Sequence, residues 1–295
     1  MTWTAVALLA LGVLLAEPVS RMLAGARWPT RDPIGALLLW QAVGLSGGLA
    51  LLGAGVTYGL APLGGSLPAA LSTLHSTRVH LATPHLAALF ASAALAVRLL
   101  GVLGLATVRT LRARRRHRNL LDVLATPWPA MAGAQVLAHP LPVAYCLPGL
   151  RSRLVVSEGA LAALSADELA AVLAHEHAHL RERHDLVVLP FVAWGATAPW
   201  VPGMARAQAA VAALVEMRAD DVARAHAGRG ALAGALRQVG GTAASATLTS
   251  FSAALTRRLD RLGHTPAELP TTARLIPRLA ALTLVAAPTI ALLAP

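Results

Sequence analysis

The stretch SADELAAVLAHEHAH, residues 165–179, decides the fold of the central part of this chain. Ser165 is followed three residues later by Glu168, which is a capping box at the start of a helix. Apolar residues then recur at helical spacing. We therefore expect a helix that begins about ten residues before His175 and carries the histidines on its last turns.

The histidines at the end of this helix fit the H-E-x-x-H pattern, a zinc-binding motif of metallopeptidases. His175 and His179 are four residues apart, so a helix projects both side chains from one face. Two imidazoles at that separation can hold one Zn²⁺ ion. Glu176 lies about 100° around the helix from His175, where it can reach a water on the metal and act as the general base.

A second motif supplies the missing zinc ligand. Glu216 and Asp220 are again four residues apart and share a face of a second predicted helix. Glu216 can complete a His₂Glu site with an open fourth position, and Asp220 can accept a hydrogen bond from the far nitrogen of a ligand histidine. The alternative is a surface helix that carries three histidines by chance. The second motif favours the zinc site.

Several polar residues near the motif have simpler interpretations. His177 falls on the other side of the helix, so we expect it to be exposed. His184 and Asp185 follow the motif, and a cap or a salt bridge explains them better than catalysis. Cys146, the single cysteine, is expected to be a small buried hydrophobic residue.

The composition is that of a membrane protein. Hydrophobic residues make up 56% of the chain and charged residues 13%, with a mean hydropathy of +0.61. The net charge is +11, and every basic residue is arginine. These arginines gather beside apolar segments, where anionic lipid and topology account for them, so we expect no direct nucleic-acid binding.

Four apolar segments are predicted to cross the membrane. They are residues 3–19, 34–60, 84–108 and 279–295. The second is rich in glycine, which permits close helix packing in lipid. Arg98 lies within the third, so it should face other helices or extend toward the interface. The arginine run 109–118 follows this span and places the next region in the cytoplasm.

The predicted organisation is a mainly α membrane protein of about four transmembrane helices. A three-helix membrane region (1–110) precedes a cytoplasmic α+β zinc domain (111–275), and a last span (276–295) follows. Residues 187–201 are apolar, but a single crossing there would separate Glu216 from His179. This segment is therefore re-entrant, interfacial or packed within the domain. The expected location is the bacterial inner membrane, with the site facing the cytoplasm.

Three short strands are predicted at residues 135–137, 143–147 and 154–157. An exposed strand beside a peptidase site can hold a peptide substrate by adding it to the sheet edge. We assign that role to residues 143–147, with an ordinary structural strand as an equal alternative. Arg224 and His226, which follow Glu216 on its helix, are candidate donors to the oxyanion of the reaction.

The chain resembles the BlaR/MecR-type integral-membrane zinc metallopeptidases, which are gluzincin-like. The resemblance rests on YCLPG (145–149), LVVSEGAL (154–161), ELAAVLAHE (168–176) and EMRADD (216–221). It implies that His175, His179 and Glu216 bind zinc, that Glu176 is the base and that Asp220 supports a ligand. It also implies a cytoplasmic domain between the third and fourth spans. Because the sequence stops at Pro295, we expect no extracellular sensor domain after the last span.

The resemblance implies a zinc endopeptidase whose substrate is a winged-helix repressor of the BlaI/MecI type. An alternative is a quality-control or processing protease of the HtpX/CAAX type, which shares both motifs. A second alternative is a non-hydrolytic membrane receptor with a structural zinc site, although such a site has no need of Glu176. A transporter has only Arg98 in its favour.

Overall fold

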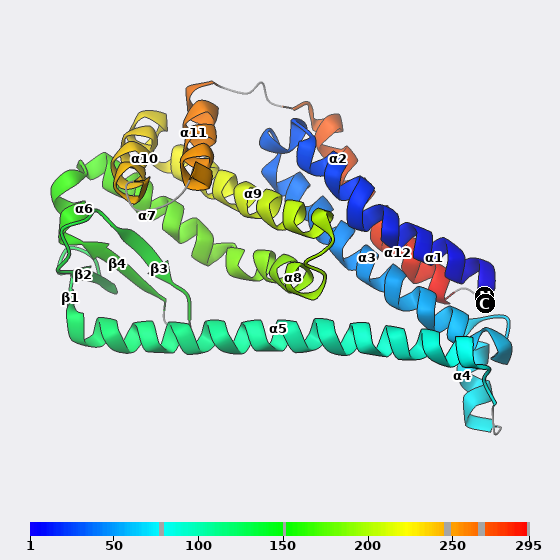
Figure 1. Cartoon of the computed structure of the whole chain (residues 1–295). Coiled ribbons are helices and arrows are strands. Elements are labelled where there is room, and N and C mark those ends of the chain that lie inside the picture. The colour runs from blue at the N-terminus through cyan, green and yellow to red at the C-terminus, as the bar shows by residue number, and fades with distance from the viewer. Residues whose placement is uncertain (77–79, 150–151, 245–248, 265–268, 294–295) are drawn as a thin grey trace. The chain divides into compact units, whose positions relative to one another are not determined.

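The computed structural model describes residues 1–76, 80–149, 152–244, 249–264 and 269–293 (Figure 1). The chain forms two compact units. The span unit comprises Met1–Ala106, Val187–Ala212 and Leu269–Pro295, and the site unit comprises Thr107–Leu186 and Ala213–Glu268. The domain boundaries expected near residues 110 and 275 stay predictions. The intervening segment Val187–Ala212 packs with the apolar helices.

Four helical segments are long and apolar enough to cross a membrane, in agreement with the four expected spans. The first consists of α1 (Thr2–Leu14), a π-helical turn (Leu15–Val19) and α2 (Ser20–Gly25). The second is α3 (Pro33–Leu60), which continues into a 3₁₀ turn (Ala61–Leu63). The third is α5 (Thr83–Leu124), and the fourth is α12 (Thr271–Leu293). Pro18 lies within the π-helical turn, where it removes one backbone donor from the helix.

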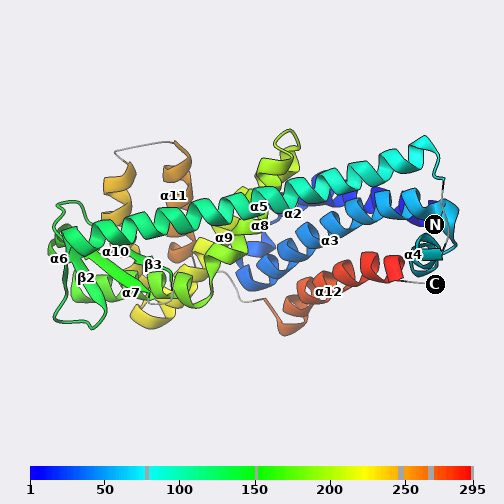
Figure 2. The same cartoon turned by 90° about the horizontal axis from the view of Figure 1, so that it is seen from below.

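Small residues bring the first, second and fourth spans together. Both views show α3 and α12 side by side (Figure 2). A Cβ atom on Gly53 of α3 would lie 2.8 Å from the Leu292 side chain of α12. A Cβ on Gly12 of α1 would lie 2.6 Å from the Leu51 side chain. A larger residue at either position would have to displace these leucine side chains, so glycine lets the helices pack this closely.

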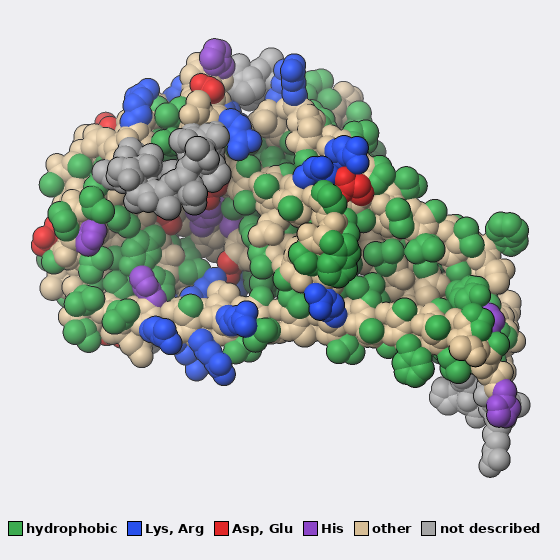
Figure 3. Space-filling model, viewed as in Figure 1, with side chains coloured by type: hydrophobic (Ala, Val, Ile, Leu, Met, Phe, Trp, Pro, Cys, Tyr) green, Lys and Arg blue, Asp and Glu red, His purple; other side chains and the backbone are tan. Residues whose placement is uncertain are grey.

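The third span extends further than the sequence predicts. The expected span 84–108 and the arginine run 109–118 belong to one helix, the 42-residue α5. Arginine has a high helix propensity, so the run prolongs the helix instead of ending it. Figure 3 shows apolar side chains along one half of α5 and basic side chains along the other. The change from apolar to basic residues therefore occurs within a continuous helix.

The apolar segment near residues 187–201 does not form a helix long enough to be a candidate membrane span. It forms most of α8 (His184–Thr197), whose 14 residues are too few for a crossing. Within the span unit, Gln41 donates a hydrogen bond to the Val187 carbonyl (2.7 Å), and Trp40 packs edge-on against Phe191. The expected alternative of packing within the zinc domain is not what the structure shows, because the segment packs with the apolar helices of the span unit.

Arg98 faces other helices, as expected. Its Nε donates to the Thr197 carbonyl (3.0 Å), and its Nη2 donates to the Ala196 carbonyl (3.3 Å). Both carbonyls lie at the C-terminal end of α8, where no intrahelical donor is left for them. Arg98 thus caps α8 with a positive charge, which also complements the helix dipole.

The site unit contains a four-stranded sheet with the order β1-β2-β4-β3. Its strands are β1 (Ala125–Pro127), β2 (Ala134–Leu137), β3 (Ala144–Leu147) and β4 (Arg153–Ser157). The last three were predicted, and β1 was not. β2 pairs parallel with β4, whereas β3 pairs antiparallel with β4 and forms one edge of the sheet. The strand assigned to substrate binding is therefore an edge strand.

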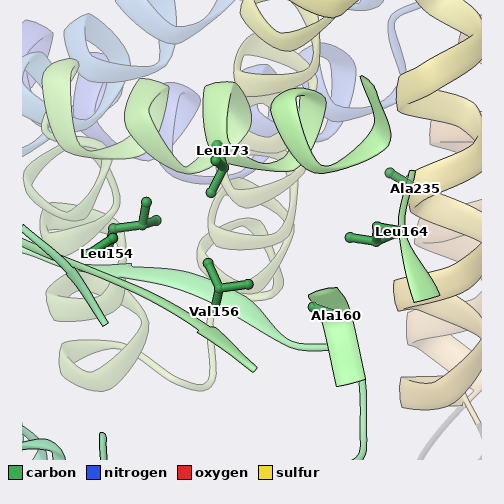
Figure 4. Close-up of a cluster of buried hydrophobic side chains, with 7 residues drawn as sticks. Leu154, Val156, Ala160, Leu164, Leu173 and Ala235 are labelled. Carbon is green, nitrogen blue, oxygen red and sulfur yellow. The ribbon is translucent and has the colours of Figure 1, made fainter. Parts of the chain in front are cut away.

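The central strand β4 is covered on both faces. Leu154 and Val156 point toward Leu173 on α7 (Ala166–Arg181), as Figure 4 shows. The intervening Val155 packs on the opposite side, against Leu121 of α5. This alternation follows from the two-residue period of a strand. It fixes α7, the helix of the H-E-x-x-H motif, against the sheet.

The remaining helices complete the two units. They are α4 (Leu67–Ser76), α6 (Glu158–Ala163), α9 (Pro202–Ala227), α10 (Arg229–Ala244) and α11 (Thr249–Gly263), with a 3₁₀ turn at Trp28–Thr30. In the site unit, α10 packs against both α7 and α11. Glu216 and Asp220 lie on α9, and Arg258 lies on α11.

Candidate metal centre

The capping box positions the motif helix as predicted. Ser165 Oγ accepts a hydrogen bond from the Glu168 backbone N–H (3.3 Å), and the Glu168 carboxylate accepts one from the Ser165 N–H (2.9 Å). These contacts satisfy two backbone donors that the first turn leaves free. α7 then runs without a break to Arg181, so all of residues 175–179 are helical.

The three predicted ligands converge on one point. The Nε2 atoms of His175 and His179 lie 3.1 Å apart. Glu216 places one carboxylate oxygen 3.4 Å from the Nε2 of His175 and the other 3.5 Å from the Nε2 of His179. Tetrahedral zinc holds its ligands at about 2.0–2.1 Å, which separates neighbouring ligand atoms by about 3.4 Å. The three donors therefore fit a zinc ion in both chemical type and spacing.

Asp220 lies behind His175, as the sequence predicts. Its Oδ1 is 3.1 Å from the Nδ1 of His175, and its side chain is almost fully buried. The ring N–H does not point along this line, so the contact is an ion-pair contact and not a fully formed hydrogen bond. It still orients the ring, because the Nε2 of His175 then faces Glu216 and His179.

The electrostatics of the two histidines differ. Burial alone lowers the pKa of His175, but Asp220 and Glu216 outweigh it and raise this pKa to about 9. Burial and the neighbouring charge of His175 lower the pKa of His179 to about 4. Without metal, the site thus holds one protonated and one neutral imidazole between two carboxylates.

Glu176 is held by the edge strand. Its Oε2 accepts a hydrogen bond from the Cys146 backbone N–H of β3 (3.1 Å). Burial raises the pKa of Glu176, the direction that suits a group that must take up a proton near neutral pH. Burial and the charge of Glu176 also raise the pKa of the Cys146 thiol to about 12. Cys146 is therefore a neutral, half-buried side chain, packed against the cluster around Val156.

Arg258 is a site residue that the sequence did not reveal. Its Nε and Nη2 donate to the two oxygens of Asp220 (2.8 and 2.6 Å), and its Nη1 lies 3.1 Å from Glu216. Three residues further along α11, Arg261 pairs with Asp221 at 2.8 Å. These two pairs hold α11 against α9. No spacing rule links Arg258 to the motifs, because it lies 42 positions after Glu216, with a separate helix between them.

Arg224 and His226, the two candidate hydrogen-bond donors to the oxyanion, lie further along α9 than the metal ligand Glu216. Arg224 lies eight residues beyond Glu216 on α9, which is about 12 Å along the helix axis, and His226 lies about 15 Å along it. Arg224 pairs instead with Asp221 (3.6 Å), and His226 is exposed. In the part of the chain that the structure describes, Arg258 is the arginine that contacts Glu216 and Asp220.

The residues beside the motif separate into exposed and buried ones. His177 is exposed, and its Nδ1 lies 2.9 Å from the carbonyl of Leu173 on its own helix. Asp185 forms a salt bridge with Arg114 (3.1 Å), as the sequence suggested for this pair of residues. His184 also contacts a carboxylate, that of Glu182 (3.2 Å), but it is buried, and its Nδ1 lies 2.9 Å from the Nδ1 of His179, which was not expected. An isolated histidine after a helix gives no sequence signal for such a contact.

The comparisons with known proteins agree with this geometry. The model of peptidase family M48 matches residues 108–257, just over half of the chain. Searches of curated proteins and of solved structures found no match. The matched region contains the motif helix, Glu216, Asp220 and the edge strand. The chain therefore belongs to peptidase family M48, a family of membrane-associated zinc metallopeptidases.

Proposed function

We propose that this protein is a membrane-embedded zinc endopeptidase that hydrolyses peptide bonds at the cytoplasmic face of the bacterial inner membrane. The observation that carries the proposal is the convergence of His175, His179 and Glu216 at zinc spacing beside Glu176. The membership in family M48 supports peptidase chemistry at this site.

Each residue has a distinct role in the proposed reaction. His175, His179 and Glu216 hold the metal, and Asp220 and Arg258 keep His175 and Glu216 in position. Bound zinc polarises the scissile carbonyl and makes a water molecule acidic enough to react near pH 7. Glu176 takes up the proton that this water loses and passes it to the leaving amine.

The edge strand β3 supports a binding mode for the substrate. The Ser157 backbone N–H donates a hydrogen bond to the Val143 carbonyl, so the backbone groups of Val143 are directed toward β4. Backbone groups alternate in direction along a strand, so those of Cys146 point away from β4, and its N–H reaches Glu176. A peptide that added to this edge would lie next to the general base.

The charge distribution supports the cytoplasmic orientation. The arginine run 109–118 follows the apolar half of α5, and Arg21, Arg27 and Arg31 precede α3. Arg278 near the start of α12 pairs with Asp32 at the start of α3 (2.8 Å), so these two helices begin at the same end of the span unit. This agrees with α3 and α12 both running outward from the cytoplasm.

Two classes of substrate are compatible with the proposed endopeptidase. Cleavage of a BlaI/MecI-type winged-helix repressor rests on the resemblance to the BlaR/MecR-type enzymes, and the family match does not extend to that resemblance. Proteolysis of misfolded or precursor membrane proteins, of the HtpX/CAAX type, requires only the site itself. A comparison of the proteins that accumulate in cells with wild-type protein and with Glu176→Gln separates the two. A single repressor supports the first substrate, and many membrane proteins support the second.

The experiment for the proposed activity is a pair of measurements on the full chain in detergent, namely zinc content and cleavage of unfolded casein. Glu176→Gln should keep its zinc and lose about a hundred- to ten-thousandfold in rate, because only the base is removed. His177→Ala, on the exposed face of the same helix, should match wild type. If wild-type protein binds zinc but cleaves no faster than Glu176→Gln, the site is structural and the protein is a non-hydrolytic receptor.

A further inference from the structure

His184 is a buried histidine that the proposed reaction does not use. It is 3% exposed and begins α8, two residues after Glu182 at the end of α7. Arg183 between them has a φ of 52°, a left-handed conformation that separates the end of α7 from the start of α8. This turn places the His184 ring edge-on against His179, with the ring centroids 4.8 Å apart.

The contacts of His184 form a chain that leads away from the metal site. Its Nδ1 lies 2.9 Å from the Nδ1 of His179, and its Nε2 lies 3.2 Å from the carboxylate of Glu182. Arg218 of α9 donates to both oxygens of that carboxylate, with three contacts between 2.6 and 3.0 Å. The order is therefore His179, His184, Glu182 and Arg218.

Zinc binding at His179 would fix the direction of the hydrogen bonds that His184 makes to His179 and Glu182. The Nε2 of His179 faces His175 and Glu216, so it is the atom that binds the metal and its Nδ1 carries the ring proton. His184 must then accept at Nδ1 and carry its own proton on Nε2. That proton points to Glu182, an acceptor that Arg218 holds in place. A doubly protonated His184 would instead set two N–H groups against each other.

We propose that His184 is a positioning residue for the zinc ligand His179, with Glu182 and Arg218 as its anchor. The inference rests on the proposed zinc site. It gives the two ligand histidines parallel supports: Asp220 and Arg258 stand behind His175, and the buried His184 links His179 to Glu182 and Arg218. The imidazole of His184 lies between His179 and the carboxylate of Glu182.

The test is the zinc affinity of the full chain in detergent at one fixed pH, measured by competition with a chelating dye. His184→Phe keeps the ring volume and removes the acceptor, so zinc affinity should fall about ten- to a hundredfold. His184→Asn places a side-chain oxygen near the position of Nδ1 and should recover most of the affinity. His177→Phe is the matched control on the exposed face and should bind zinc as wild type does.

A role in folding alone gives a different pattern. In that case His184→Phe and His184→Asn would lose zinc to the same extent, or His184→Phe would bind it as tightly as wild type, and either result overturns the proposal. The absorption spectrum of cobalt in the site gives a second readout, because a misoriented His179 shifts the bands of bound Co²⁺. The spectrum should change in His184→Phe and not in His184→Asn.

A second variant guards against a misfolded His184→Phe protein. Glu182→Gln removes the negative charge beside the Nε2 of His184. An amide N–H₂ then takes the place of one carboxylate oxygen and opposes the proton on this Nε2. Zinc affinity should fall in this variant as well, and unchanged affinity contradicts the proposed chain of hydrogen bonds. If wild-type protein binds no zinc, or His175→Ala binds it equally well, the proposed zinc site itself is wrong.

Discussion

Arg258 binds both oxygens of Asp220, at 2.8 and 2.6 Å, and so fixes the carboxylate that lies behind His175. The pair is well shielded, because the Asp220 side chain is 2% exposed and that of Arg258 is 17% exposed. Burial alone would raise the pKa of Asp220, but the contacts with His175 and Arg258 outweigh burial and lower this pKa to about 2. The arrangement connects α11 to the zinc ligands of α7 and α9.

The first prediction concerns this pair. Arg258→Ala leaves the buried Asp220 with only the protonated His175 as its cation, which should lower the free energy of unfolding by up to about 3–5 kcal/mol. Thermal unfolding of the zinc-free protein in detergent measures this loss, and zinc competition should show weaker binding. Arg258→Lys should restore neither the stability nor the zinc affinity, because a single ammonium group does not replace the two-point contact.

Arg224→Ala should be close to neutral, and a large loss of activity in that variant would support Arg224 as an oxyanion donor.

The second prediction is that zinc affinity rises with pH. With a pKa of about 9, His175 holds an extra proton at neutral pH that zinc must displace from its Nε2. His179, with a pKa of about 4, is already neutral and releases none. Affinity should therefore increase nearly tenfold per pH unit from about pH 7 to 8.5 and level off above about pH 9. Calorimetric titration in two buffers should show release of about one proton, and constant affinity across this range would contradict the assignment.

The third prediction separates the Cys146 side chain from its backbone. Because the pKa of the thiol is about 12, it is not a nucleophile at neutral pH, and Cys146→Ala should retain its peptidase activity. Cys146→Pro removes the N–H that holds Glu176 and should lose most of that activity. The assay is casein cleavage, with zinc content as the control for folding of the site. Equal activity in both variants would show that this hydrogen bond does not position the base.

The fourth prediction concerns the cap on α8. Arg98→Met removes two charge-assisted hydrogen bonds to the carbonyls of residues 196 and 197, which should lower the free energy of unfolding by about 1–3 kcal/mol. A lower melting temperature of the detergent-solubilised protein is the readout. Leu100→Ala, at a nearby position of α5 that is 68% exposed, should have a smaller effect. A melting temperature equal to wild type would mean that Arg98 does not stabilise α8.

Local sequence signals predicted the elements that carry the site. The capping box at Ser165 and Glu168 located the start of α7, and the four-residue spacings identified the faces that carry His175, His179 and Glu216. Strands β2 to β4 were also found, because each is a short apolar run between turn residues. These features depend only on neighbours in the sequence.

The residues that were missed depend on tertiary contacts. Arg258 reaches the site from a helix far along the chain, and His184 does so through the left-handed turn at Arg183. The arginine run was expected to mark the end of a span, whereas α5 continues through it to Leu124. A basic segment fixes the side of the membrane but does not by itself interrupt a helix.

The central claim is that His175, His179 and Glu216 bind one zinc ion with an open coordination position. X-ray absorption at the zinc edge, combined with metal stoichiometry, tests it most directly on the full chain. The account predicts one zinc per chain, two imidazole nitrogens and light oxygen ligands at about 2.0–2.1 Å, and loss of the metal in Glu216→Ala. A sulfur ligand near 2.3 Å, or full zinc content in Glu216→Ala, would contradict it.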